Sequence, residues 1–509
     1  VENRNDETRG LVADWLRPLI SLCYTPELLN EINRNQVSEV RQRRLRQAQQ
    51  FSMLQYSHAG FERADAVLRS LFPVLKSERE ESDFRHLVGA VAAEADAFLT
   101  RDDDLLAHAE DVFNACGLPV VRPAELIGRI DTIEHEREYQ RSFLAGTRQI
   151  VQERISRVDD SLAATIQQPG EQRSKVTAAL NRYLADPQRY RCEKIVGADG
   201  SIVAFLVVER DSGVDRIPML RICGKRQLGA LVRSLLTGII RRAARAGSTA
   251  VFVSESSLPD PVRTACSSLG FLSVRGGELK LVVSGLLSVD QVAGMLTWPD
   301  EKVEQLVSAL PVARNDSYLA SHIEHLLWPL KLADGPLPSF IVPIRPQFAA
   351  QIVDERLAGG SLFGVDVDLA LNCEAVYYRA ARPAVIEPPG RVLWYVSQCD
   401  DYPGTMTIRA CSRLVEVAID TPKRLYSQFR RLGVFEWPHV RKTAKGDLTG
   451  KIMAFRFDDS EHLRPVAREA FQTILRSHGI KSNLQSPVKI PAEAFNQIYA
   501  SAVDSPSAR

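Results

Sequence analysis

Apolar and polar residues alternate along the chain with two different periods, which predict where helices and strands lie. Residues 83–95 carry apolar side chains at helical spacing, and Ala97-Phe98-Leu99-Thr100 is a short apolar run typical of a buried strand. A second such strand follows at Gly117-Leu118-Pro119-Val120-Val121. This succession of helix and strand over residues 1–130 predicts a parallel α/β sheet.

The middle of the chain changes pattern twice. Residues 131–192 are rich in Glu, Arg and Gln with apolar residues at helical spacing, which predicts a helical connector. Residues 193–285 turn to strands around one long helix from about 228 to 245; the family resemblance described below implies that these strands form a mixed sheet. Residues 286–335 return to short helices and are expected to form a helical linker.

Prolines mark the start of the last part of the chain, residues 336–509. Short strand candidates follow, among them Val392-Leu393-Trp394-Tyr395-Val396 and Ile452-Met453-Ala454-Phe455-Arg456-Phe457. Such a series is typical of a small β-barrel with a few helices. The chain as a whole therefore predicts a multidomain α/β and α+β protein.

The composition is that of a globular protein, with 45% hydrophobic and 25% charged residues among 509. That length corresponds to about three domains. The net charge of +1 excludes a uniformly basic nucleic-acid coat, although one domain can still carry a basic patch. No apolar run approaches the ~20 residues that span a bilayer, so no membrane contact is expected.

The eight cysteines are scattered and never stand at C-x-x-C spacing, which argues against a zinc ribbon and against a disulfide scaffold. A reducing cytoplasm is the expected location. The first six residues are polar and do not resemble a signal peptide. Because they include no Met, we expect a processed or cut chain.

Acidic residues follow the predicted strand at 97–100. Asp102 stands directly after it, Asp83 lies in the helix before it, and Glu31 lies in an early helix. Carboxylates at the carboxyl edge of a parallel sheet lie where ligands bind in α/β folds, and Mg²⁺ prefers such oxygen ligands. The alternative is that these acids only cap helices.

Residues 82–106 and 117–126, with Thr25-Pro26-Glu27-Leu28-Leu29-Asn30-Glu31-Ile32, resemble a PIN-domain nuclease. The resemblance implies a ribonuclease that depends on Mg²⁺ or Mn²⁺. It implies Glu31, Asp83 and Asp102 as its catalytic, metal-binding acids, with Glu27 the alternate to Glu31. The family's first strand ends in an Asp-Thr-Asn-like motif that residues 1–10 lack, so we expect either a cut upstream of Val1 or one ligand fewer.

A basic, glycine-containing turn precedes the long helix of the central part. Backbone amides at a helix start suit a pyrophosphate. The order of strand, turn, helix and strand over residues 193–285 is similar to a GNAT-type acetyltransferase. The resemblance implies acetyl-CoA as a cofactor, held by Arg226, Leu228, Gly229, Ala230 and Leu231. Cys266 stands where the family often has a Tyr general acid, and we expect it to be a packed core cysteine.

Residues 338–460 resemble an ASCH domain, a β-barrel related to PUA domains, which implies association with RNA. Cations gather near aromatic residues there, and cations contact phosphates while aromatic rings stack on unpaired bases. The candidate RNA-binding residues are Arg430, Arg431, Trp437, Arg441 and Lys442. Alternatively, the aromatic residues belong to the core and the cations form a solvated face.

His322 and His325 stand three apart on a predicted helix, which is a spacing of metal ligands, but no acid or Cys is evident beside them. We therefore expect an ordinary helix surface.

The leading hypothesis is a cytoplasmic, bacterial ribonuclease whose GNAT-like part binds CoA and whose ASCH-like part binds RNA. A tRNA target and a toxin or stress-response role extend this from the company of the domains alone. One alternative is an acetyltransferase acting on RNA or aminoacyl-tRNA, with a degenerate PIN domain. The other is a non-enzymatic RNA-binding regulator.

Overall fold

The computed structural model describes residues 7–136, 142–143, 150–223, 228–255, 257–346, 348–349, 373–399, 405–429, 432 and 437–503. The chain divides into two compact units. Unit 1 comprises Val1–Gln140 and Arg154–Cys192, and unit 2 comprises Arg141–Glu153 and Glu193–Arg509. Among the described residues, no helix is both long and apolar enough to cross a membrane.

Unit 1 is mainly helical. Its strands form two parallel pairs, β1 (Cys23–Tyr24) with β2 (Ser52–Met53), and β3 (Phe98–Leu99) with β4 (Val120–Val121). The strands are parallel, as predicted, but over the described residues they do not join into one sheet. The helices α1 (Glu27–Asn33) and α2 (Ser38–Ala48) come first in the chain. With only two residues in each strand, most of the apolar core comes from the helices that follow, α3 (His58–Arg69), α4 (Glu78–Ala92), α5 (Asp103–Ala107) and α6 (Ala109–Cys116).

The remainder of unit 1 contains η1 (Glu7–Val12), α7 (Pro123–Glu134), α9 (Asp160–Ile166) and α10 (Arg173–Leu184). The predicted helical connector is thus helical in part, because β5 (Ser142–Phe143) and β6 (Val151–Arg154) belong to a sheet. Gly128 lies in α7 so close to the chain beyond β6 that a Cβ there would be 2.2 Å from the carbonyl oxygen of Ser156.

Unit 2 contains an eight-stranded sheet of order β11-β12-β10-β9-β8-β7-β6-β5. Its remaining strands are β7 (Tyr190–Val196), β8 (Ile202–Asp211), β9 (Val214–Ile222), β10 (Ala250–Val253), β11 (Leu272–Val274) and β12 (Gly277–Leu281). β9 and β10 are parallel, whereas β8 with β9 and β10 with β12 are antiparallel. The mixed sheet predicted for residues 193–285 is therefore confirmed.

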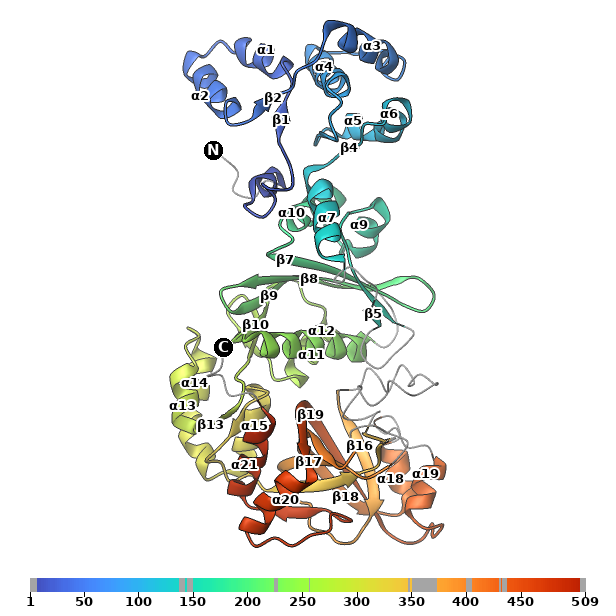
Figure 1. Cartoon of the computed structure of the whole chain (residues 1–509). Helices are drawn as coiled ribbons and strands as arrows, with labels where there is room; N and C mark the ends of the chain where they lie inside the picture. The colour runs from blue at the N-terminus through green and yellow to red at the C-terminus, as the bar shows by residue number, and fades with distance from the viewer. Residues whose placement is uncertain are drawn as a thin grey trace. The chain divides into compact units, whose positions relative to one another are not determined.

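Two helices cover one face of this sheet, α11 (Leu228–Ala246) and α12 (Asp260–Ser268) (Figure 1). α11 matches the helix predicted at about 228–245. Its apolar side, which includes Val232 and Leu236, packs on Leu206 and Leu220 of the sheet and forms one core.

The segment predicted as a linker, residues 286–335, packs instead against the eight-stranded sheet and forms a second core with it. It forms β13 (Leu286–Leu287), α13 (Val289–Met295), α14 (Glu301–Ala309), η2 (Leu310–Arg314), α15 (Ser317–Leu326) and β14 (Lys331–Leu332). Val292, Leu306 and Ile323 are buried there together with Phe252 and Leu279 of the eight-stranded sheet. Residues 286–335 are thus part of the interior of unit 2.

The C-terminal part is built on a six-stranded sheet of order β16-β19-β18-β17-β15-β20. Its strands are β15 (Ser339–Ile344), β16 (Ala375–Ala380), β17 (Gly390–Val396), β18 (Thr407–Asp420), β19 (Ile452–Ala467) and β20 (Val488–Ile490). Among the described residues of this part, the helices α18 (Pro422–Phe429), α19 (Trp437–Thr443), α20 (Arg468–Ser477) and α21 (Ala492–Ala502) accompany it.

The prediction of a closed barrel is not met by the described residues, since the edge strands β16 and β20 do not pair. The reason lies in the two-residue period of β17. Val392 and Trp394 enter a core on one face, and Leu393 and Tyr395 enter another on the opposite face. Because α20 and α21 cover the second face, the sheet buries apolar residues on both sides without closing on itself (Figure 1).

Candidate functional sites

Three predicted metal ligands in unit 1 come from three different elements and are near enough to influence one another electrostatically, although their ligand atoms do not all lie within 4.8 Å of one another. Glu31 lies in α1, Asp83 in α4, and Asp102 after β3. Burial raises the pKa of Asp83, and the negative charges of Asp102 and Glu31 raise it further. Acids separated by up to 71 residues of sequence therefore act on one another through space.

A cationic side chain and a helix start are the neighbours of two of these carboxylates. Arg79 lies 3.7 Å from Asp83 and 3.8 Å from Asp102. Asp102 also caps α5, because its Oδ1 accepts hydrogen bonds from the backbone amides of Asp104 and Leu105. The three acids fit a hard divalent cation by donor chemistry, and the guanidinium of Arg79 stands beside two of them.

Glu31 and its alternate Glu27 differ in their surroundings. The hydroxyl of Ser82 lies between them, 2.7 Å from Glu31 Oε1 and 3.0 Å from Glu27 Oε1. Burial opposes ionisation of Glu27, but hydrogen bonds from Asn30, Ser82 and Arg34 outweigh it and lower its pKa. Glu27 is therefore a buried carboxylate whose hydrogen bonds are supplied by the protein. Glu31 contacts His86 at 3.4 Å and is more exposed, so it is more accessible to a ligand.

The predicted CoA site of unit 2 is described in part. Arg226 and the side chain of Leu228 lie outside the described residues. At Gly229 a Cβ would meet nothing within 4 Å, so the start of α11 is open there, and Ala230 is half-buried next to it. Leu231, by contrast, is buried in the core between α11 and the sheet.

The parallel pairing of β9 with β10 ends before β9 does. Their pairing ends at Ile217 and Val253, and β9 continues for five more residues. A carboxylate oxygen of Glu255 accepts a hydrogen bond from the backbone N–H of Leu220 at 3.4 Å and contacts Arg221 at 2.9 Å. Cys266 lies in the core, as expected, and burial raises its pKa to about 12.

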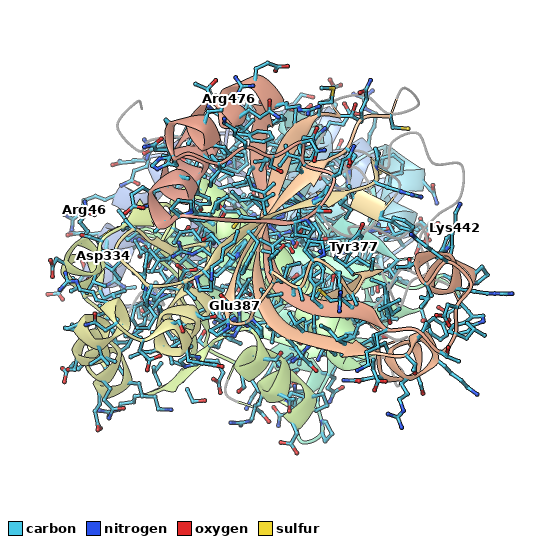
Figure 2. The ribbon with its side chains drawn as sticks, turned by 90° about the horizontal axis from the view of Figure 1, so that it is seen from below. Arg46, Asp334, Tyr377, Glu387, Lys442 and Arg476 are labelled. Carbon is cyan, nitrogen blue, oxygen red and sulfur yellow. The ribbon has the colours of Figure 1, made fainter. Side chains whose placement is uncertain are left out.

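The predicted RNA-binding residues divide into three groups. Arg430 and Arg431 lie outside the described residues. Arg441 and Lys442 are exposed on α19, and Figure 2 shows Lys442 at the outer edge of the C-terminal part. Trp437 is half-buried, packs on the core and has its ring 5.4 Å from that of Tyr426, so only part of it is available for stacking.

The structure also contains a site that the sequence reasoning missed. His325 is buried rather than part of a helix surface, because its Nδ1 lies 2.7 Å from Oδ2 of Asp459 in β19. Arg413 contacts Asp459 at 3.1 Å and donates to both oxygens of Asp458, at 2.8 and 2.6 Å. The indole N–H of Trp328 donates to the backbone oxygen of Asp459 at 2.8 Å.

Burial and charge set the ionisation of this cluster. Burial opposes the charge of Asp459, but His325 and Arg413 lower its pKa well below the ordinary range. Burial and the neighbouring Asp459 raise the pKa of Asp458 to about 6. Lys280 is fully buried and donates to the backbone oxygen of His325 at 2.6 Å, and burial lowers its pKa to about 8.

Among the described residues, His325, Asp458 and Asp459 are the group whose ligand atoms lie within 4.8 Å of one another, as a metal site requires. The guanidinium of Arg413 already pairs with both carboxylates. The signal in the sequence was the pair of adjacent acids directly after an apolar strand run, ending at Phe457. Their partner His325 lies on α15, 134 residues from Asp459 in the sequence. Motif spacings cover only short stretches of chain and therefore cannot pair these residues.

No protein-family model matches the chain, and no curated protein matches its sequence. Among solved structures, it is similar to an ASCH protein from Zymomonas mobilis, at 17% identity over 32% of this chain and 96% of that one, with a TM-score of 0.25. It is also similar to a spermidine N-acetyltransferase chimera from Vibrio cholerae, at 12% identity over 26% and 93%, with a TM-score of 0.22.

A third similar structure is the IAA acetyltransferase from Bacillus cereus, at 18% identity over 24% of this chain and 77% of that one, with a TM-score of 0.19. None of these three proteins is named as a nuclease. The chain is thus similar, over parts of its length, to ASCH and acetyltransferase structures.

Proposed function

We propose that the protein is a metal-dependent ribonuclease in which Glu31, Asp83 and Asp102 hold Mg²⁺ or Mn²⁺. The observation that supports it is the approach of these acids from three elements: burial raises the pKa of Asp83, and the charges of Asp102 and Glu31 raise it further. Like charges gathered at a half-buried position repel one another, and this repulsion is relieved when a divalent cation binds between them. RNA would lie along the basic α19 surface of unit 2.

Each residue has a separate task in this proposal. The bound metal would supply a water of lowered pKa and neutralise charge on the phosphate. Ser82 orients Glu31 through its 2.7 Å hydrogen bond, and Asp102 remains fixed by its role at the start of α5. Arg79, whose side chain is 83% exposed, is free to turn from the carboxylates to a phosphate of the RNA.

The test is Mn²⁺ binding and cleavage of single-stranded RNA by the full chain and by Asp83→Asn. We expect the variant to lose cleavage at least 100-fold and to bind Mn²⁺ more weakly. Asp111→Asn on α6 is the matched control, since Asp111 is exposed and lies outside the site. Cleavage that persists unchanged in Asp83→Asn would refute the proposal.

A second candidate function is acyl transfer from CoA, supported by the open position at Gly229 and by the residues of β9 that extend beyond its pairing with β10. Backbone amides that lose their sheet partner are available to a ligand. Glu255 already accepts from one of these amides, that of Leu220, so the acyl group would have to displace it.

Calorimetry with CoA separates this candidate from the first. Binding that is abolished in Gly229→Glu supports it, and the same titration with Gly238→Glu is the control, since Gly238 lies in the same helix and also faces open space. An absence of CoA binding would remove it. If RNA cleavage were absent as well, a non-enzymatic RNA-binding role would remain.

A further inference from the structure

A cavity of about 40 Å³ lies inside unit 2, between α11 and the C-terminal sheet. α11 contributes Arg233, Thr237 and Arg241, which are spaced four residues apart and therefore share one face of the helix. The opposite wall includes Cys373 and Ser460. Thr237 Oγ1 lies 3.1 Å from the thiol of Cys373, and Arg241 donates to the backbone oxygen of Ser460 at 3.3 Å, so the two walls are in contact.

The acids near this cavity are already paired. Glu374 contacts Arg456 at 3.0 Å, and Arg413 contacts both Asp458 and Asp459, the latter also paired with His325. These carboxylates therefore have little negative charge left to offer a further cation.

The two arginines of α11 have no such partner. Within the described ranges, neither Arg233 nor Arg241 forms an ion pair, and the Nε of Arg241 is buried without a hydrogen-bond partner. Both guanidinium groups lie close enough to Cys373 to lower its pKa, against the larger effect of burial, so they point to the same place. Lys280 lines the cavity as a third cation.

The size of the cavity limits what it can hold. A volume of about 40 Å³ corresponds to roughly three water positions at about 10–15 Å³ each. It has room for a small ion but not for a nucleobase or a pantetheine arm. Guanidinium groups present paired N–H donors that match the oxygens of a phosphate, and buried charged donors form the stronger hydrogen bonds.

We infer that this cavity binds a phosphate-type oxyanion between Arg233, Arg241 and Thr237. The anion would accept hydrogen bonds from the two guanidinium groups and from the Thr237 hydroxyl, and so supply the missing partner of Arg241 Nε. It would be either inorganic phosphate or the terminal phosphate of a nucleotide. The inference is independent of the nuclease proposal, because all of these residues lie in unit 2.

The test is calorimetric titration of the full chain with inorganic phosphate at constant ionic strength. We expect one site per chain, at least tenfold weaker binding in Arg233→Gln and in Arg241→Gln, and unchanged binding in Arg245→Gln. Arg245 is the matched control, since it lies on the same helix but is exposed and does not line the cavity. No binding, or equal binding in all three variants, would overturn the inference.

A second measurement does not depend on the folding of any variant. Bound phosphate would cover the thiol of Cys373, so it should slow alkylation of Cys373 in the unmodified chain while leaving the exposed Cys23 unaffected. Equal alkylation of Cys373 with and without phosphate would contradict the inference. Competition by a nucleoside 5′-monophosphate, but not by the nucleoside, identifies a terminal phosphate as the ligand, and failure to compete identifies free phosphate.

Discussion

Nδ1 of His325 lies 2.7 Å from Oδ2 of Asp459, which joins α15 to β19 across 134 residues of sequence. The same carboxylate contacts Arg413, and the backbone oxygen of Asp459 accepts from Trp328. One residue of β19 thus contacts the helix, the sheet and the loop after the helix. The C-terminal sheet and residues 286–335 are held together by buried polar contacts as well as by apolar packing.

Replacing Asp459 by Asn should destabilise unit 2 by about 3 kcal/mol, because Arg413 loses part of its charge partner in a buried site. Denaturant unfolding followed by tryptophan fluorescence measures this, since Trp298, Trp328, Trp394 and Trp437 lie in unit 2. Glu304→Gln on the exposed side of α14 should change stability by less than about 0.5 kcal/mol. Equal stability of the two variants would show that the buried pair contributes nothing.

Lys280 should give unit 2 a rise in stability at alkaline pH. Its folded pKa of about 8 lies below the model-compound value of 10.5, so the folded state releases the proton first. The cost of burying the charge is fully present below about pH 8 and is relieved as the pH rises toward 10.5, by up to about 3 kcal/mol.

The measurement is the difference in unfolding free energy between the parent chain and Lys280→Met, from pH 7.5 to 10. Groups that titrate in both proteins cancel in this difference. We expect the parent to gain stability over Lys280→Met across that range. A difference that stays constant with pH would mean that Lys280 is charged throughout.

Gly128→Ala sets helix propensity against a steric clash. Within α7 an Ala would be favoured over Gly by about 1 kcal/mol, but the new Cβ would lie 2.2 Å from the Ser156 carbonyl oxygen. Because that contact is with backbone, we expect the clash to exceed the propensity gain and unit 1 to be destabilised. Gly238→Ala in α11, where a Cβ meets nothing within 4 Å, should instead be stabilising, and thermal unfolding measures both.

The α19 surface should bind RNA through its phosphates. Arg441→Ala with Lys442→Ala should weaken binding to single-stranded RNA and reduce the slope of log K against log salt by about 0.7 for each lost contact. Lys302→Ala, on the exposed side of α14, is the control. An affinity that is unchanged in the double variant at low salt would exclude this surface as an RNA site.

Local patterns predicted the elements better than their assembly. The helix at about 228–245 and the strands at 392–396 and 452–457 were found because a short window of sequence carries their period. The acids Glu31, Asp83 and Asp102 were placed together by a family resemblance, and the structure brings them close enough to act on one another.

What the sequence could not supply were partners far apart in the chain. His325 was predicted to lie on a helix surface because no acid stands near it in the sequence. Its partner, Asp459, comes from a strand 134 residues later. Residues 286–335 were predicted to be a linker because short amphipathic helices look alike whether they join domains or complete one. The burial of Val292, Leu306 and Ile323 against Phe252 is visible only in three dimensions.

The packing of residues 286–335 bears on how this chain can be dissected or recombined. An excised segment of residues 193–285 would leave Phe252 and Leu279 uncovered, and those two side chains belong to a core that residues 286–335 complete. The C-terminal sheet, cut away in turn, would lose the His325 partner of Asp459. The eight-stranded and six-stranded sheets of unit 2 are therefore not independent modules, and a transplant would have to carry both sheets together with residues 286–335.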